Sequence, residues 1–487
     1  MDSVLEDGRL FGVGAASGVG SGPGPVGAAK TFRRYDPAQS FLMPPCLDDW
    51  LPGDHTARFV GEAVDELLDL SGVYASYVGA SGAPPYDPKM MLKLLVYGYS
   101  TGVTSSREME RRCHVDVAFR WLSANSAPDY RSLARFRRRH LDALDALFVQ
   151  VLALCAGAGL VKLGRVALDG TKLRASASRH KAMSHNRLGP RIAQLETEVA
   201  AILAEAEATD RAEDEMFGED RRGDEVPAEL ARRETRLVKM RAAKEAIEAE
   251  ARHKAGKRAA AKARSTGSDE GEVQAQAQAA AEAATPEKKT QRNFTDPDAR
   301  MMKTNDGFHY AYNAQAVVDE HSQVALAAAL TQCAGDVGEL FDMVEATNTN
   351  LADAGIDERP EVVLADAGYC SEDNLQTATD NQINVLVATG RLKHHERVAD
   401  APRGPIPKNA TQRERMARRL RTKKGRVDYA RRKAIVEPAF GQMKVRQHAG
   451  FLRLRGLHGA QGEWTLHVLC HNLRKLANAR ATPVALA

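Results

Sequence analysis

The sequence predicts an α/β protein in which a mixed sheet follows a helical N-terminal domain and is interrupted by a long helical insertion. Residues 41–160 place apolar side chains at helical spacing. Short β-branched and apolar runs then begin near 163, 308, 361 and 383, with helical patterns between them. Residues 191–284, between the first two runs, are rich in Ala, Glu and Arg and poor in aromatics. The resulting order of strand, insertion, hairpin, helix, strand, helix, strand and helix is typical of a mixed sheet.

Changes of composition and pattern divide the 487 residues into eight segments. A chain of this length is expected to contain more than one domain. The hydrophobic content of 43% is sufficient for a proper core. We expect a flexible Gly-rich tail at 1–32, a helical N-terminal domain at 33–160, the first strand of the core at 161–190, a charged helical or coiled-coil insertion at 191–290, the remainder of the sheet at 291–390, a basic linker at 391–428, C-terminal helices at 429–480 and a short tail at 481–487.

Helix signals in the N-terminal domain come from capping residues and proline. Asp54 is expected to cap a helix over 54–70, and Pro88 to occupy the first position of a helix over 87–102. Ser105 and Glu108 have the spacing of a capping box. The domain is therefore predicted to consist of short helices joined by tight turns.

An Arg-rich helical pattern closes this domain between Asp129 and Phe148. Its apolar residues share one face, and four arginines occupy the other faces: Arg135, Arg137, Arg138 and Arg139. Short helices followed by an Arg-rich helix indicate a helix-turn-helix type of DNA-binding unit. A helical bundle with a solvated basic face remains the alternative, because the two are hard to separate by pattern.

The charge is unevenly distributed, although the net formal charge is only +4. From Arg391 to Gly456 the chain carries 20 Lys and Arg residues against 5 Asp and Glu residues, so the rest of the chain is net negative. Such a basic block is the usual footprint of a polyanionic partner.

Several classes of protein are excluded or disfavoured. The six cysteines are scattered without a CxxC pair, which argues against a disulfide scaffold and a structural zinc site and suits a reducing cytoplasm. No GxxxxGK[ST] motif occurs, so a nucleotide-driven motor is not expected. The start of the chain has no signal-peptide pattern, and the longest apolar stretch, 146–161, is too short for a membrane span and is predicted to be a buried helix.

Three carboxylates stand out by their context. Asp169 and Asp366 each end a predicted strand, and Glu437 lies in a helical pattern with basic residues on both sides. Strand ends at one edge of an α/β sheet converge, and carboxylates there can share divalent cations that serve phosphodiester chemistry. A single Asp at a strand end is more often a turn or helix cap, so the three residues alone do not decide the function.

The strings "ALDGTKLRA" (167–175), "NFTDPDARMMK" (293–303), "YNAQAVVD" (312–319), "VVLADAGYCSEDN" (362–374) and "VEPAFGQMK" (436–444) carry a family resemblance. So do "PPYDPKMMLKLLVYGYSTGVTSSREMER" (84–111), "DVAFRWLS" (116–123) and "ARFRRRHL" (134–141) in the N-terminal domain. Together they resemble DDE transposases of bacterial insertion sequences, in the group numbered eleven-eighty-two of the class with a Tyr-Arg-Glu-Lys signature. The resemblance extends over about residues 33–480.

The resemblance implies a ribonuclease H-like catalytic core that cleaves and joins DNA with Mg²⁺, for which Mn²⁺ can substitute. It assigns catalysis and metal binding to Asp169, Asp366 and Glu437. The signature's Tyr and Lys fall on Tyr429 and Lys444, which we expect to contact DNA. For its Arg, the spacing from Tyr429 selects Arg432, whereas the spacing from Glu437 selects Lys433. We prefer Arg432, because a guanidinium can hold a phosphate with two hydrogen bonds.

The same resemblance implies the partners. They are double-stranded DNA, as the terminal inverted repeats and the target, and a second copy of the chain in the complex that joins two ends. Neither a nucleotide nor a membrane is expected, and the protein is placed in the bacterial cytoplasm, on the nucleoid when bound to DNA.

Two alternatives concern the activity. A tyrosine recombinase would explain "HNLR" at 471–474, but it needs a Tyr nucleophile downstream, and the last Tyr is Tyr429. A catalytically inactive, transposase-derived DNA-binding protein stays open. A coiled-coil scaffold would account for the insertion alone.

Overall fold

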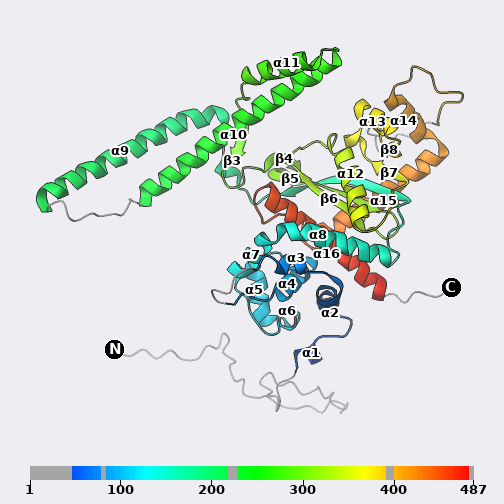
Figure 1. The fold of residues 1–487 in the computed structure, drawn as a ribbon, viewed down its shortest axis with the longest axis horizontal. Coiled ribbons are helices and arrows are strands. Elements are labelled where there is room, and N and C mark those ends of the chain that lie inside the picture. The colour runs from blue at the N-terminus through cyan, green and yellow to red at the C-terminus, as the bar shows by residue number, and fades with distance from the viewer. Residues whose placement is uncertain (1–45, 78–83, 218–227, 391–399, 482–487) are drawn as a thin grey trace, which may run out of the picture. The chain divides into compact units, whose positions relative to one another are not determined.

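The computed structural model describes residues 46–77, 84–217, 228–390 and 400–481 (Figure 1). All the helices and strands given below lie in one compact unit, Leu47–Ala487, which we call the second unit of the chain. The predicted Gly-rich tail at 1–32 and residues 482–487 of the predicted C-terminal tail lie outside the described residues.

The centre of the second unit is a six-stranded mixed sheet, as predicted. Its strands are β1 (Arg165–Arg174), β4 (Arg300–Thr304), β5 (Gly307–Asp319), β6 (Ala325–Thr331), β7 (Val362–Ala365) and β8 (Val385–Val387). β5 pairs antiparallel with β1 on one side and with β4 and β6 on the other, while β7 and β8 continue the sheet beyond β1 in parallel. The hairpin β5–β6 and the strands β7 and β8 were all expected from their apolar runs.

The first strand is longer than the sequence indicated. It was expected to end at Asp169 and Gly170, but β1 continues to Arg174 because β5 pairs with it from Val166 to Arg174. Its second half contains polar residues that lack the β-branched pattern of the first half. The position of Asp169 is therefore the middle of a strand, which corrects the expectation of a strand end.

Two short strands close the base of the insertion and were not predicted. β2 (Ala182–Ser184) pairs antiparallel with β3 (Gln291–Asn293), so the chain leaves and re-enters the core at one place. Between them lie α9 (His185–Phe217), α10 (Ala228–Ser265) and α11 (Glu270–Glu282), which begin ahead of the predicted residue 191. A small apolar cluster joins α9 and α10 and includes Leu188, Leu195, Leu237, Met240 and Ile247. These helices occupy the segment that was expected to be a charged helical or coiled-coil insertion.

The N-terminal helices are α1 (Leu47–Trp50), α2 (Thr56–Glu62) with a π-helical continuation at Ala63–Leu67, α3 (Ser71–Tyr74), α4 (Pro88–Ser100), α5 (Ser106–Val115), α6 (Val117–Leu122), α7 (Tyr130–Arg139) and α8 (Leu141–Gly157). Pro88 begins α4 as expected. The cap of α2 is His55 and not Asp54, because the His55 ring accepts the Ala57 N–H at 3.2 Å. The capping box at Ser105 is also wrong: Glu108 binds Arg111 and Arg112 instead.

The Arg-rich pattern was read as one helix but forms two. α7 ends at Arg139 with His140 as its C-cap, and α8 leaves it at an angle of 71°. His140 is buried with its ring against Phe136 and Tyr77, so the chain turns where this side chain enters the core. In the part of the chain that the structure describes, no single helix could cross a membrane, and only the bent pair α7 and α8 meets the length and composition criterion together.

The C-terminal half supplies α12 (Glu339–Asp353), α13 (Glu372–Asp380), α14 (Gln412–Arg421), α15 (Lys423–Arg446) and α16 (Leu457–Ala481). The expected basic linker at 391–428 is largely helical from 412 onward, because Thr411 and Glu414 form a capping box for α14 and Thr422 caps α15. α15 packs on β1, and α16 packs between α8 and β6 (Figure 1). Trp464 and His467 of α16 are fully buried.

Candidate functional site

Two aspartates lie side by side where β1 and β7 separate. The parallel pairing of these strands ends at Leu168 and Ala365, and the next residue in each chain is acidic: Asp169 and Asp366. Neighbouring parallel strands in register direct such side chains to the same level of the sheet. The structure thus brings together two of the three predicted carboxylates, although Asp169 lies within its strand.

Asp169 faces α15. Its Oδ2 accepts a hydrogen bond from Arg432 Nη1 at 2.9 Å, and its Oδ1 accepts the N–H of Gly170 at 2.8 Å. On the same face of the sheet the residues opposite Asp169 and Thr171 on β5 are Ala316 and Ala314. These small side chains leave room for long basic side chains of α15 to reach β1.

Asp169 is mostly buried next to a second carboxylate. Desolvation raises the pKa of Asp169, Arg432 opposes this shift, and the nearby charge of Asp366 adds to it. A second carboxylate next to a buried one disfavours ionisation of both, unless a cation lies between them. A hard divalent cation, which prefers oxygen ligands, would supply the positive charge that two adjacent carboxylates need.

Lys444 and Tyr429 of α15 approach the same site from either side of Arg432. The ammonium of Lys444 donates to the hydroxyl of Thr171, two residues after Asp169 on β1. Burial lowers the pKa of Lys444, and the charge of Asp169 acts in the opposite direction. Tyr429 is half-buried, and burial raises its pKa. Three of the four signature positions therefore gather over the middle of β1.

Glu437 is placed differently. It is exposed on α15, and across residues 46–77, 84–217, 228–390 and 400–481 no group of three or more His, Cys, Asp or Glu side chains is close enough to hold a metal ion. The next residue is Pro438, which has no N–H to donate to Ala434 O, and Gln323 Nε2 donates to that carbonyl instead at 3.0 Å. Asp169 and Asp366 fit the donor chemistry of Mg²⁺, but the third carboxylate does not join them in this conformation.

Arg432 is buried next to the acid pair with its hydrogen-bonding capacity partly unused. Its side chain is 10% exposed, and its Nε has no partner among the described residues. Since buried N–H groups are rarely left unpaired, this donor indicates an acceptor that is absent from the free protein. A phosphate oxygen is the acceptor that a guanidinium recognises best.

The turn that follows Asp366 is held by a polar network that the sequence did not reveal. Asp366 Oδ1 accepts the N–H of Gly368 at 2.7 Å, and the buried Tyr369 donates its hydroxyl to Gln315. Gln315 in turn donates to Asp336 Oδ1 at 2.9 Å. A Cβ on Gly368 would meet Asp366 Oδ1 at 2.9 Å and Asp336 Oδ2 at 3.2 Å, so this glycine is required by close approach. The signal in the sequence that could have indicated this network is a polar residue, Gln315, within the otherwise apolar inner strand β5.

The arginines of α7 do not share one environment. Arg135 and Arg138 are exposed. Arg137 is 6% exposed and donates to Tyr99 Oη and to Thr104 O, so the expectation that it contacts DNA is corrected by its burial. Arg139 is exposed but lies over the Tyr77 ring and donates to Ser76 O.

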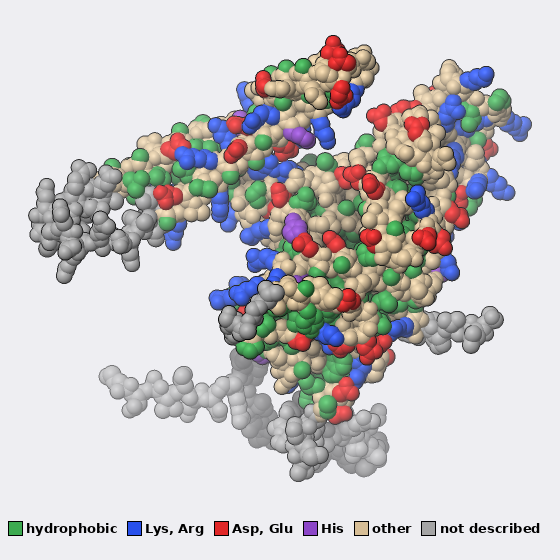
Figure 2. Space-filling view, viewed as in Figure 1, with side chains coloured by type: hydrophobic (Ala, Val, Ile, Leu, Met, Phe, Trp, Pro, Cys, Tyr) green, Lys and Arg blue, Asp and Glu red, His purple; other side chains and the backbone are tan. Residues whose placement is uncertain are grey.

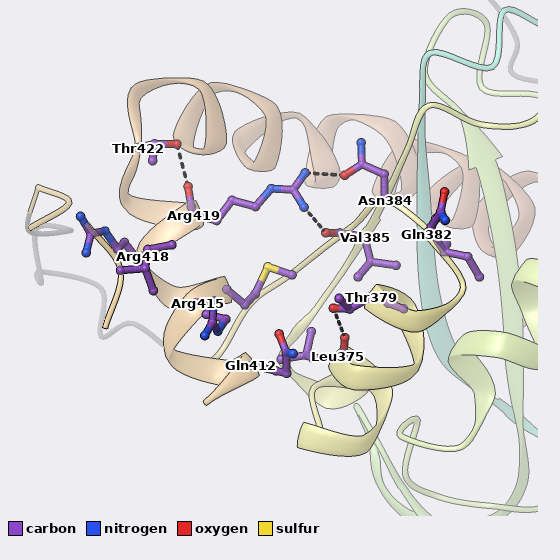
Figure 3. A pocket seen from close by; sticks show the side chains of 14 residues that line it. Leu375, Thr379, Gln382, Asn384, Val385, Gln412, Arg415, Arg418, Arg419 and Thr422 are labelled. Carbon is purple, nitrogen blue, oxygen red and sulfur yellow. Dashed lines mark hydrogen bonds between the residues drawn. The ribbon is translucent and has the colours of Figure 1, made fainter. Parts of the chain in front are cut away.

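One cavity of about 520 Å³ lies between α13, β8 and α14, away from Asp169. Figure 3 shows Arg419 reaching across it to Asn384 Oδ1 and Val385 O. Arg415 and Arg418 bind the carbonyls of residues 402–410 in the same way. Of these arginines of the predicted basic block, Arg419 therefore joins α14 to β8, whereas Arg415 and Arg418 hold the loop that precedes α14.

Comparison with known protein families gives two matches. Residues 45–139 match the family described as Transposase domain (DUF772), and residues 283–473 match the family described as Transposase DDE domain. The second match contains Asp366, Glu437 and the signature positions of α15, whereas β1 with Asp169 and most of the insertion lie outside it. No curated protein and no solved structure matches the chain. The chain therefore carries the two domains of a DDE transposase.

Proposed function

We propose that the protein is a DNA transposase that binds the terminal inverted repeats of an insertion sequence. It cleaves their phosphodiester bonds with Mg²⁺ and transfers the strand ends to target DNA, in the bacterial cytoplasm and on the nucleoid. The observation that carries this proposal is the register of β1 and β7, which sets Asp169 beside Asp366. The group numbered eleven-eighty-two and the Tyr-Arg-Glu-Lys class are part of the same proposal.

Asp169, Asp366 and Glu437 are the proposed metal ligands, with Mn²⁺ able to replace Mg²⁺. A pair of divalent cations would activate the attacking oxygen and stabilise the leaving one. The side chains of the protein contribute charge and position. Arg432, whose Nε has no partner among the described residues, would hold a phosphate oxygen, and Lys444, which donates to Thr171, would neutralise the phosphate charge.

The strand order supports a ribonuclease H-like core. Along the path β6-β5-β1-β7-β8, with these five strands counted in chain order, the sheet reads three, two, one, four, five, and β4 is an additional strand that pairs with β5. Among β1, β5, β7 and β8, only β5 is antiparallel to the others. In such a sheet the first and fourth strands are neighbours, which is the arrangement that joins Asp169 to Asp366. α7, with Arg135 and Arg138 exposed, is proposed as a DNA-binding helix. Joining two ends requires two copies, so we propose a homodimer on DNA.

A catalytically inactive DNA-binding protein is the second candidate. The exposed position of Glu437 and the ion pair that occupies Asp169 favour it. Activity separates the two candidates, because both of them bind DNA.

The test is cleavage of a labelled duplex that carries the inverted repeats flanking the coding region. Wild type is expected to release a nicked product in Mg²⁺ and none in EDTA, and Asp366→Asn and Glu437→Gln are expected to be inactive. Asp353→Asn removes an exposed carboxylate at the end of α12 and is the matched control, with wild-type activity. Equal product from wild type, Asp366→Asn and Glu437→Gln would refute the catalytic assignment.

A further inference from the structure

The loop between α15 and α16 carries an exposed set of basic and aromatic side chains. It begins just after Lys444, and its residues Phe451, Arg453 and Arg455 are exposed. The Phe451 ring is 38% exposed, with the Arg453 guanidinium 5.9 Å from its centroid. Exposed arginines beside an exposed aromatic ring are typical of surfaces that bind nucleic acid.

This loop is held rigidly although its side chains face solvent. The N–H of Leu452 donates to Arg174 O at 2.8 Å, and the N–H of Arg174 donates to Gly450 O at 3.0 Å. The loop therefore pairs alongside the last residue of β1. Glu463 of α16 is fully buried and accepts the N–H groups of Arg453 and Leu454, each at 2.7 Å.

Further bonds tie the loop to the core and to the N-terminal helices. Asp296 and Asp298 accept the N–H groups of Gly456 and Leu457 at 3.1 and 2.9 Å. Tyr99 donates to the other carboxylate oxygen of Glu463 at 2.7 Å. A surface fixed by buried groups from three parts of the chain presents its charges in a defined arrangement.

Three adjoining hollows connect this loop to α7. The first, of about 300 Å³, is lined by Arg174, Lys181, His309, Phe451 and Arg455 among others. The second, of about 530 Å³, shares Arg455 with the first and includes Arg138. The third, of about 750 Å³, shares Arg138 with the second and lies along the arginines of α7. We call this series of hollows the basic track.

The track is strongly positive. The acidic neighbours are Asp298, occupied by Leu457 N–H, Asp306, 3.8 Å from Arg174, and Asp142, 3.5 Å from His458. Figure 2 shows Lys and Arg side chains along the body between the base of α10 and α7. Arg174 follows Asp169 by five residues on β1, which is about 17 Å at the rise of a strand. The track therefore begins within a few nucleotides of the acid pair.

We propose that the basic track binds the sugar-phosphate backbone of duplex DNA between α7 and the acid pair. Arg138, Lys181 and Arg455 contact phosphates, and Phe451 lies against the strand nearest to Asp169. The role of this DNA as the transposon end rests on the proposed function, whereas the binding itself does not. Lys181 and His309 lie outside the basic block of residues 391–456, so the track extends the DNA-binding surface onto β5 and the segment after β1.

The first experiment measures binding without catalysis. Fluorescence anisotropy follows a labelled 30-base-pair duplex of random sequence in EDTA, across a series of salt concentrations. The triple variant Arg138→Gln, Lys181→Gln, Arg455→Gln is expected to weaken binding at least about tenfold at low salt. It should also reduce the slope of log K against log salt by about 2 to 3, since each phosphate contact contributes about 0.9. This change in slope corresponds to the loss of the three phosphate contacts that we propose for Arg138, Lys181 and Arg455.

The control is Arg359→Gln, an exposed arginine at the opposite end of the sheet, before β7. This variant should not change the affinity or the slope by more than the loss of a single phosphate contact would, which is about 0.9 in the slope. An unchanged slope in the triple variant, or an equal loss in Arg359→Gln, would overturn the proposal. Only variants whose thermal unfolding midpoint equals that of wild type are compared. Substitutions at these exposed positions are expected to leave the midpoint unchanged.

A second measurement locates the DNA. Phe451→p-benzoylphenylalanine is expected to crosslink the duplex on irradiation. Ile406→p-benzoylphenylalanine, at an equally exposed apolar residue beside α14, is expected not to do so. Crosslinking at Ile406 and not at Phe451 would contradict the track. Both measurements are repeated with Asp366→Asn, so a protein that fails to cleave DNA can still confirm the track, and an active transposase can still refute it.

Discussion

Arg432 Nη1 lies 2.9 Å from Asp169 Oδ2, and both side chains are mostly buried. The ion pair joins the first acidic residue of the proposed metal site to the arginine of the proposed signature. In the free protein the guanidinium supplies the positive charge that the buried carboxylate needs. The same contact keeps the proposed metal ligand occupied, so the binding of metal and DNA is expected to exchange one cation for another.

Loss of this ion pair should destabilise the free protein. Arg432→Gln leaves Asp169 buried without its cation, and we expect the free energy of unfolding at pH 7 to fall by about 2 to 3 kcal/mol. Arg431, on the same helix as Arg432, is exposed and forms an ion pair with Glu320, which follows β5. Arg431→Gln breaks this pair and should lower the free energy of unfolding by less than about 0.5 kcal/mol. Urea denaturation measures both, and equal losses would mean that the burial of Asp169 has no energetic consequence.

Two glycines of α15 should respond in opposite directions to alanine. A Cβ on Gly425 would lie 2.1 Å from the backbone carbonyl oxygen of Arg419, so Gly425→Ala must push α14 and α15 apart, at about 2 kcal/mol or more. Gly441 has open space around its Cα and is exposed in a helix interior, so Gly441→Ala should stabilise by about 0.5 to 1 kcal/mol. Thermal unfolding of the two variants is the measurement. A destabilised Gly441→Ala would show that the helix is constrained there.

Acidification should destabilise the protein through buried histidines. Burial lowers the pKa of His467 to about 3, with Arg137 and His448 acting in the same direction, and that of His471 to about 4. The unfolded chain binds these protons below about pH 6.5 and the folded chain does not, so stability falls as the pH drops from 6.5 toward the folded values. Between pH 6.5 and 4.5 each histidine contributes a loss of about 2 kcal/mol.

The variant His467→Asn isolates this contribution. It removes the titrating group, so its own loss of stability between pH 6.5 and 4.5 should be smaller than that of wild type by about 2 kcal/mol. Denaturation curves at the two pH values give this difference. An identical pH dependence in the two proteins would show that His467 is protonated in the folded state.

Lys433 and Lys444 of α15 test which basic positions face the reaction. Lys444→Met removes the charge beside Thr171, and cleavage of transposon-end DNA is expected to fall by about 10²-fold, as when one preorganised donor is lost. Lys433 is exposed and was the alternative signature position; Lys433→Met should change cleavage by less than about threefold. Single-turnover kinetics give both rates. The reverse ranking would show that Lys433, and not Lys444, faces the reaction.

The arrangement of the sheet could be predicted because apolar runs and their order determine strand pairing. The runs at β1, β5, β6, β7 and β8 gave a mixed sheet. The adjacency of Asp169 and Asp366 was expected from strand ends at one edge, although Asp169 lies in the middle of β1. The length of β1 could not be predicted, since its second half is stabilised by pairing with β5 and not by its own composition.

Side-chain direction was less accessible from the pattern. Arg137 looks like its neighbours in the sequence, but its face of α7 is turned toward Tyr99 and Glu463 by the bend at His140, which depends on tertiary packing. The anchoring of the loop after α15 depends on Glu463 and Asp296, which are distant in sequence from one another. Contacts of this range carry no periodic signal.

The most direct test of the central claim, that Asp366 is a metal ligand beside Asp169, changes the ligand and the metal together. A thiolate is a softer ligand than a carboxylate and suits Mn²⁺ better than Mg²⁺. Asp366→Cys should therefore fail to nick transposon-end DNA in Mg²⁺ and regain measurable nicking in Mn²⁺, whereas Asp366→Asn should be inactive with either ion. Nicking by Asp366→Cys in Mg²⁺ at the wild-type rate would contradict the account.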